Sequence, residues 1–270
     1  MNLTRFSHGL SLINTSTAAA GAGLSPLIWK DCDLLGMLTD PGVGTLVKDD
    51  FTKVLATAHG YELTNHNGTF TAVAGSQYGE ALLATGATDN DEAHISYNND
   101  VAGCIKCNTS QKWWYEARVK LSQVAAAGGV FVGLMEQAAS ANDIMADTTM
   151  ALTATIDCIG FQILDAAPAA ITYWRTMMQL AAKASVSATA AVPTATYVKL
   201  GMKSTPNAAG TIATVKFFVN GLPLADSTTS AATDFPLDVV LIPNFSIKTG
   251  TAAVFSLTID WWQAAQLSRV

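Results

Sequence analysis

The sequence predicts an all-β protein, a two-sheet antiparallel β-sandwich with an extended N-terminal arm, and three observations support this prediction. Residues 115–121 alternate between apolar and polar side chains, and Trp113 continues the apolar face, as in a strand with one buried face. Residues 130–135 are apolar on both faces, as in a strand at the middle of a packed sheet. Roughly a dozen further segments of strand-like composition are separated by turn signals, which favours a sandwich.

Residues 1–48 precede the predicted sandwich and fall into two parts. Residues 1–26 are mostly small and polar, so alone they are expected to be flexible, either as an arm that lies on a partner or as a disordered tail. Residues 27–48 include a stretch too apolar to stay in water, which ends at the turn signal Asp40-Pro41-Gly42. We expect it to form a clasp that packs on the main body or on a neighbour. The sandwich is expected over residues 49–270.

The strands of the sandwich are predicted from alternation and from turn signals. Asn-Gly pairs at 67–68 and 220–221 each predict a β-hairpin, and residues 137–157, which show no period, predict a long loop. In the last strand, Phe255, Leu257, Ile259 and Trp261 are expected to share the buried face. Strands are predicted at 61–64, 69–73, 80–85, 93–97, 113–121, 130–135, 159–164, 171–177, 197–203, 214–219, 222–225, 239–242, 245–248 and 254–262.

The composition points to a protein whose surface is partly covered. Hydrophobic residues make up 50% of the 270 residues, whereas charged residues make up only 13%, about half the usual share. A soluble monomer normally carries more charge on its surface. This composition therefore suits contact with other subunits; a monomer with a Ser/Thr-rich exterior is the alternative.

Charge and hydropathy exclude two classes of partner. The net charge of −6, without a Lys/Arg stripe, argues against a nucleic-acid-binding protein. No apolar run approaches the ~18 residues that a membrane-spanning helix needs, so no membrane partner is expected. The N-terminus shows no signal-peptide pattern, which predicts synthesis in a reducing cytoplasm, and the four cysteines fit that setting as buried small hydrophobes.

In this order the strands resemble the concanavalin A-like lectin/glucanase jelly roll over roughly residues 49–263. The most specific piece is Phe217-Phe218-Val219-Asn220-Gly221, because that superfamily carries an aromatic-Val-Asp/Asn-Gly turn there. The N-terminal part, with Trp29-Lys30-Asp31-Cys32 and Asp49-Asp50-Phe51, is similar to that of tailed-bacteriophage structural proteins built on this jelly roll. Such a resemblance implies a fold and not, by itself, a function.

The glutamates argue against glycosidase chemistry. Glucanases of this superfamily carry Glu-x-Asp-x-Glu on one strand, which projects two carboxylates into the cleft. None of the five glutamates here has a carboxylate at i+2 or i+4 on a predicted strand. Glu116 is in phase with Arg118 and Lys120, so we expect it in an exterior ion pair. We predict that the protein is not an enzyme and has no catalytic residue.

No metal or cofactor is predicted. Acidic and amide residues at 88–92 and 98–100 could offer oxygens to calcium, but their spacing matches no EF-hand loop. Cys104 and Cys107 form a lone Cys-x-x-Cys, and positions i and i+3 of a strand point to opposite faces, so two separately buried thiols are expected. No nucleophile motif such as Gly-x-Ser-x-Gly and no nucleotide-binding glycine loop is present.

The preferred hypothesis is a virion structural protein, a capsid decoration (cement) protein on the capsid surface. Its partners would be the major capsid protein and copies of itself, with a trimer expected. This hypothesis explains the low charge, the arm, the apolar clasp and the missing catalytic carboxylates. The expected contact residues are Phe6, Leu10, Trp29, Leu34, Leu35 and Met37.

Two other classes remain open. A carbohydrate-binding module of a tail fibre or virion surface would stack sugar rings on exposed tryptophans, with Trp114 and Trp174 as candidates. Trp114 and Trp262 fall on predicted outer faces, where each could also anchor a subunit or be capped by a loop or by the clasp. A glycan hydrolase would need a carboxylate pair brought together from separate strands.

Overall fold

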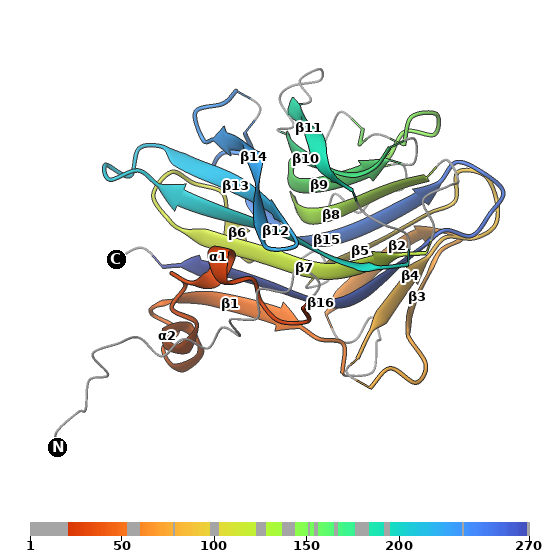
Figure 1. Cartoon of the computed structure of the whole chain (residues 1–270), viewed down its shortest axis with the longest axis horizontal. Coiled ribbons are helices and arrows are strands. Elements are labelled where there is room, and N and C mark those ends of the chain that lie inside the picture. The colour runs from red at the N-terminus through yellow and green to blue at the C-terminus, as the bar shows by residue number, and fades with distance from the viewer. Residues whose placement is uncertain are drawn as a thin grey trace.

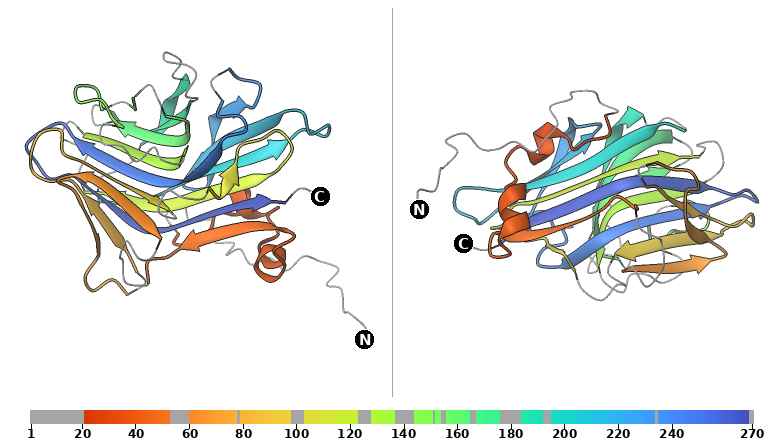
Figure 2. Two further views of the ribbon diagram at one scale, coloured as in Figure 1. Left: turned by 180° about the vertical axis from the view of Figure 1, so that it is seen from behind. Right: turned by 90° about the horizontal axis from the view of Figure 1, so that it is seen from below.

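The computed structural model describes residues 21–52, 60–77, 79–97, 103–122, 128–136, 144–150, 152–153, 156–164, 167–175, 184–191, 195–233 and 235–268. Two antiparallel sheets pack face to face, and two short helices lie on the outer side of one of them (Figures 1 and 2). The predicted all-β, two-sheet sandwich is confirmed.

Sheet 1 has the order β14-β13-β12-β7-β16-β4-β3, and β1 also pairs with β16. The bounds of these strands are β1 (Gly44–Asp49), β3 (Thr69–Ala72), β4 (Ala81–Ala84), β7 (Trp113–Leu121), β12 (Tyr197–Pro206), β13 (Ala213–Val219), β14 (Leu222–Thr229) and β16 (Ser256–Leu267). Because β1 begins at Gly44, the first strand of the sandwich starts before the predicted boundary at residue 49.

Sheet 2 has the order β11-β10-β9-β8-β15-β5-β2, and β6 also pairs with β15. The bounds of these strands are β2 (Tyr61–His66), β5 (Glu92–Tyr97), β6 (Ile105–Lys106), β8 (Gly128–Glu136), β9 (Cys158–Leu164), β10 (Ala167–Arg175), β11 (Ala184–Ala191) and β15 (Val240–Thr249). The structure describes β10 and β11 by their backbone alone.

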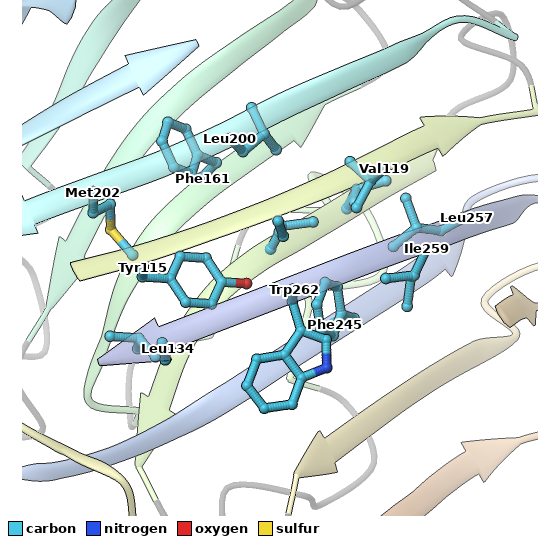
Figure 3. Packing of buried hydrophobic residues seen from close by; sticks show 14 of the residues in the cluster. Tyr115, Val119, Leu134, Phe161, Leu200, Met202, Phe245, Leu257, Ile259 and Trp262 are labelled. Atoms are coloured by element: carbon cyan, nitrogen blue, oxygen red, sulfur yellow. The ribbon is translucent and has the colours of Figure 1, made fainter. Parts of the chain in front are cut away.

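The main core lies between the sheets and follows the predicted alternation of β7. Trp113, Tyr115, Ala117, Val119 and Leu121 are all buried there. Figure 3 shows Tyr115 and Val119 of β7 beside Leu200 and Met202 of β12, with Leu134, Phe161 and Phe245 contributed by sheet 2. Burial of this apolar surface is the main driving force for folding.

A β-bulge in β16 reverses the predicted facing of two tryptophans. The pairing register with β7 shifts between Ile259 and Trp261, so one extra residue changes which side chains face the core. Trp262 is therefore buried between the sheets and donates its Nε1 proton to the Tyr61 hydroxyl at 2.8 Å. The prediction that Trp261 faces the core was wrong, because strict alternation does not include a bulge.

The two Asn-Gly signals have different outcomes. Asn220 and Gly221 have φ of 51° and 75°, as a type I′ turn requires, and they join the paired strands β13 and β14. The hairpin predicted at 67–68 was wrong, because β2 pairs with β5 in sheet 2 and β3 pairs with β4 in sheet 1. Asn67, with φ of 63°, instead marks the corner where the chain passes between the sheets.

Two glycines allow β8 and β9 to approach closely. Gly133 and Gly160 are paired across the ladder, and the ring of Phe131 lies against both positions. A Cβ atom on Gly133 would lie 2.6 Å from the Gly160 Cα and 2.6 Å from the Ile159 carbonyl oxygen.

We predict that Gly133→Ala lowers the free energy of unfolding by about 1–3 kcal/mol, because backbone rather than a flexible side chain must move. Urea denaturation measures the loss, with Ala72→Val at an exposed position of the edge strand β3 as the control. A loss no greater than that of the control would contradict the close approach.

Candidate functional site: the covered outer faces

The outer face of sheet 1 is covered by residues 21–40, which we call the N-terminal strap. The strap contains α1 (Pro26–Trp29), which begins with a proline, and α2 (Leu34–Thr39), whose N-terminus is capped when the Asp33 side chain accepts from the Gly36 amide at 2.9 Å. Its apolar side chains and the outer face of sheet 1 form a second hydrophobic cluster. The buried members are Ile28, Trp29, Leu34, Met37, Trp114, Phe218 and Ala265.

The carboxylate of Glu116, on β7, anchors the strap. It is fully buried and accepts bonds from the Ser25 amide at 3.0 Å, the Ser25 hydroxyl and the Trp29 Nε1 at 2.8 Å. Burial raises the pKa of Glu116 above its ordinary value, although the bonds from Ser25 and the charge of Lys199 act in the opposite direction. A buried carboxylate is costly without partners, so these donors account for its place under the strap.

Further polar contacts hold the strap along its length. The Trp261 Nε1 donates to the Ala22 carbonyl at 2.7 Å, and the Lys199 ammonium donates to the Gly23 carbonyl at 3.0 Å. At the other end, Asp31 pairs with Lys203 at 2.6 Å and with Lys112 at 3.2 Å. These pairs hold the pKa of Asp31 below its usual value despite partial burial.

The predicted exterior ion pair of Glu116 was wrong, because the strap covers this side chain. Arg118 pairs instead with Asp260, and its guanidinium lies 3.9 Å from the centre of the Tyr197 ring. The Tyr197 hydroxyl donates to Glu80. Burial and the nearby charge of Glu80 raise the pKa of Asp260, while Arg118 opposes this rise.

The structure places the predicted contact residues of the strap in two groups. Trp29, Leu34 and Met37 are buried against sheet 1 of their own chain, whereas Leu35 is 45% exposed. Phe6 and Leu10 lie outside the described residues. The sequence pattern left open whether the clasp packs on its own body, and the structure shows that it does.

The two tryptophans proposed for sugar stacking also differ. Trp114 is fully buried in the cluster beneath the strap, and its Nε1 lies 3.3 Å from Asp31, which leaves no open face on the indole. Trp174 pairs with Ile159 in the β9–β10 ladder, and its side chain lies outside the described residues.

The outer face of sheet 2 carries a buried polar row that the sequence analysis missed. On β5 the outward positions are Glu92, His94 and Ser96, because Ala93 and Ile95 belong to the main core. On the neighbouring strand β15 the outward positions are Asn244, Ser246 and Lys248. Polar residues at every second position of two otherwise apolar strands were the signal that could have revealed this row.

The polar row and β9 hold a loop over the face of sheet 2. Glu92 accepts from the Ile144 amide at 3.0 Å, and Lys248 donates to the Met145 carbonyl at 2.8 Å and pairs with Glu92 at 3.0 Å. Gln162 donates to the Met150 carbonyl at 2.8 Å. The apolar side chains of the loop pack on β8 and β9. The members of this third cluster are Phe131, Met135, Ile144, Met145, Leu152, Ile156 and Cys158.

The chemistry available on these faces is limited. In the described part of the chain, Glu116, Glu92 and Asp260 are each bound to donors or cations of the same chain. The outward positions of β9 hold Cys158, Gly160 and Gln162, none of which is a carboxylate. Among the residues that the structure describes, no three His, Cys, Asp or Glu side chains are grouped as metal ligands would be. Within the same residues no helix has the length and hydrophobicity that crossing a membrane requires.

Solved structures share this architecture. No model of a protein family matches the sequence, and no curated protein matches it significantly. An endo-1,3-β-glucanase from Streptomyces sioyaensis superposes with a TM-score of 0.55 at 11% identity, over 85% of this chain and 98% of its own. The carbohydrate recognition domain of Emp47p gives 0.53 at 9% identity, over 83% and 97%. The chain has the concanavalin A-like jelly-roll fold.

This jelly roll also includes a protein of unknown function from Shewanella oneidensis MR-1, with a TM-score of 0.52 and 16% identity over 84% of this chain and 90% of that one. The predicted resemblance to the lectin/glucanase superfamily is confirmed at the level of the fold. Sequence identities this low support only the shared fold, so the function of the site must be inferred from its own residues.

Replacing Glu116 with glutamine tests the anchor of the strap. The amide nitrogen that replaces one oxygen is a donor and cannot accept from Ser25 or Trp29. We expect strap docking to weaken by about 1.5–3 kcal/mol, the range for hydrogen bonds to a charged group. Cys32 reports the docking, because burial, with the charges of Asp31 and Asp33, raises the pKa of its thiol to about 12. Its modification rate at pH 8 should rise by about tenfold or more.

The matched control is Glu62→Gln on β2, which lies on the other sheet from the strap. Peptide mass mapping separates Cys32 from the other three cysteines. Equal rates of Cys32 modification in Glu116→Gln and in the parent chain would contradict the role of Glu116 in holding the strap.

The raised pKa of Cys32 also predicts a pH profile. Because the thiolate is the reactive form, the modification rate of the parent chain should rise about tenfold per pH unit from pH 7 to 10, without a plateau. An undocked strap would give a plateau near the ordinary thiol pKa of about 8.5. Stopped-flow labelling distinguishes the two profiles.

Proposed function

We propose that this chain is a non-enzymatic structural protein of a tailed-phage virion, a decoration protein made in the host cytoplasm and placed on the capsid surface. One observation supports a structural over a catalytic role: the chain covers, with its own segments, the parts of its outer sheet faces that hold the buried carboxylates Glu116 and Glu92. The strap covers Glu116 and Trp114, and residues 144–147 contact Glu92 and Lys248 from outside the sheet. Glycoside hydrolysis needs carboxyl groups that are open to substrate.

The strap offers a surface for a partner. α2 buries Leu34 and Met37 but leaves Leu35 and Leu38 exposed, at 45% and 60%. A short helix that is apolar on two sides satisfies one side with its own sheet and leaves the other for a second surface. Residues 1–20, which contain Phe6 and Leu10, directly precede this surface.

We infer that this surface and residues 1–20 bind the major capsid protein and neighbouring copies, with a trimer as the expected assembly. Trp29, Leu34 and Met37 would then act by holding the strap in place, whereas Leu35 would touch the partner. Such contacts stabilise the shell by mass action, because they form only in the assembled state.

A carbohydrate-binding module of a tail fibre or virion surface is the second candidate. The structural likeness to a carbohydrate recognition domain and to a glucanase supports it. Trp174 remains the candidate stacking residue, because the indole of Trp114 would be accessible to a sugar only after the strap undocked.

Co-sedimentation with empty capsid shells of the encoding virus tests the proposed function. We expect the full chain to sediment alone as an oligomer, near three times the chain mass, and to pellet with shells. The double substitution Leu35→Ser/Leu38→Ser should weaken shell binding at least about tenfold, as hot-spot residues do, and leave the thermal unfolding of the monomer unchanged. Removal of residues 1–20 should also weaken it.

Val254→Ser is the matched control, because Val254 is 53% exposed and lies outside the strap. A monomer that ignores shells would contradict the decoration role. A glycan array that retains the parent chain, with loss of the signal in Trp174→Ala, would favour the carbohydrate-binding module instead.

A further inference from the structure

A hollow of about 520 Å³ opens on the outer face of sheet 1, beside the strap. Its walls come from α1 and from the strands β12, β13 and β14. The lining residues are Leu27, Lys30, Lys203, Thr205, Pro206, Asn207, Thr214, Lys216, Phe218 and Pro223. This volume is within the range of sites that bind small ligands or a few side chains of a partner.

Three lysines line this hollow, and no carboxylate does. Lys203 and Lys216 stand directly opposite each other in the β12–β13 ladder, on its outer face. Like charges at directly opposite positions destabilise a sheet unless an anion lies near them. The carboxylate of Asp31 balances the charge of Lys203, but the same carboxylate also pairs with Lys112.

The remaining positive charge is unpaired. Lys30 and Lys216 are exposed, and within the described residues neither of them forms an ion pair. This clustering runs against the rest of the chain, which has 15 Lys and Arg against 21 Asp and Glu. The hollow therefore attracts an anion on a protein that is acidic overall.

We propose that this hollow binds an acidic polypeptide segment that also carries an apolar side chain. Lysine ammonium groups only donate, so the ligand must supply acceptors, and carboxylates supply both acceptors and charge. Leu27, Pro206 and Pro223 give the hollow an apolar wall that fits an aliphatic side chain.

The lining favours a peptide over an acidic sugar. A sugar ring is held by an open aromatic face and by acceptors for its hydroxyl groups. The aromatic residue of the lining, Phe218, is only 4% exposed and so offers no open ring face. Asn207 is the one residue of the lining with a side-chain amide.

The site is built partly from the strap. Leu27 and Lys30 belong to residues 21–40, so the hollow is complete only when the strap is docked on sheet 1. By linkage, a ligand bound there stabilises the docked strap. This inference is independent of the decoration role, because it requires only the geometry of the monomer.

Fluorescence polarisation with a labelled hexapeptide, Glu-Leu-Glu-Glu-Leu-Glu, tests the proposal on the full chain. We expect saturable binding that weakens as salt is raised from about 0.05 to 0.5 M, since exposed charges are screened. The exposed double substitution Lys30→Ala/Lys216→Ala should weaken binding at least about tenfold without lowering the melting temperature, since it removes a like-charge pair from the sheet. The matched control Lys48→Ala, on β1 outside the hollow, should leave binding unchanged.

Two companion ligands identify what is recognised. A peptide with glutamine in place of each glutamate should bind at least about tenfold more weakly, because it lacks the charge. Equal binding of both peptides, or an unchanged affinity in the double variant, would overturn the proposal. Stronger competition by oligogalacturonate than by the acidic peptide would also overturn it, in favour of an acidic sugar.

Discussion

The buried carboxylate of Glu116 is the interaction on which the exposed surface of this molecule depends. A lone carboxylate on an outer strand face would ordinarily stay in water, because its desolvation costs several kcal/mol. Here the Ser25 amide and hydroxyl and the Trp29 indole supply three donors, so the charge is buried together with the aromatic residues around it. The same contacts hold α1 on sheet 1, and thereby place Leu27 and Lys30 at the lysine hollow.

Sheet 2 repeats this arrangement with different chemistry. Glu92 and Lys248 form a buried pair that also binds the loop: Glu92 accepts from the Ile144 amide, and Lys248 contacts the Met145 carbonyl and the Asp147 carboxylate. Opening the loop would remove the bonds that Ile144 and Met145 make to these buried charged groups, and this cost holds the cover in place. The parts of the two outer faces that hold Glu116 and Glu92 are thus each covered by a segment of the same chain.

Much of the fold follows from the sequence, because alternation and turn chemistry are local. Trp113 to Leu121 alternate as a half-buried strand, and Asn220-Gly221 takes the positive φ values that its turn needs. The errors arose where a tertiary contact overrode a local pattern. The bulge in β16 reverses Trp261 and Trp262, the corner at Asn67 replaces a hairpin, and the strap buries Glu116 and Trp114. The polar row and the lysine hollow join residues distant in sequence, so spacing alone could not reveal them.

Hydrogen exchange of the strap amides in the isolated chain tests this account most directly. The amides of Ile28 and Trp29 donate to the Ser25 carbonyl, that of Lys30 donates to the Pro26 carbonyl, and that of Ser25 donates to Glu116. A four-residue helix is not stable alone, so protection of these amides requires docking on sheet 1. The account predicts protection of at least about a hundredfold over an unstructured chain, and a loss of protection at these amides in Glu116→Gln. Exchange of these amides at the rate of an unstructured peptide, while β7 stays protected, would contradict it.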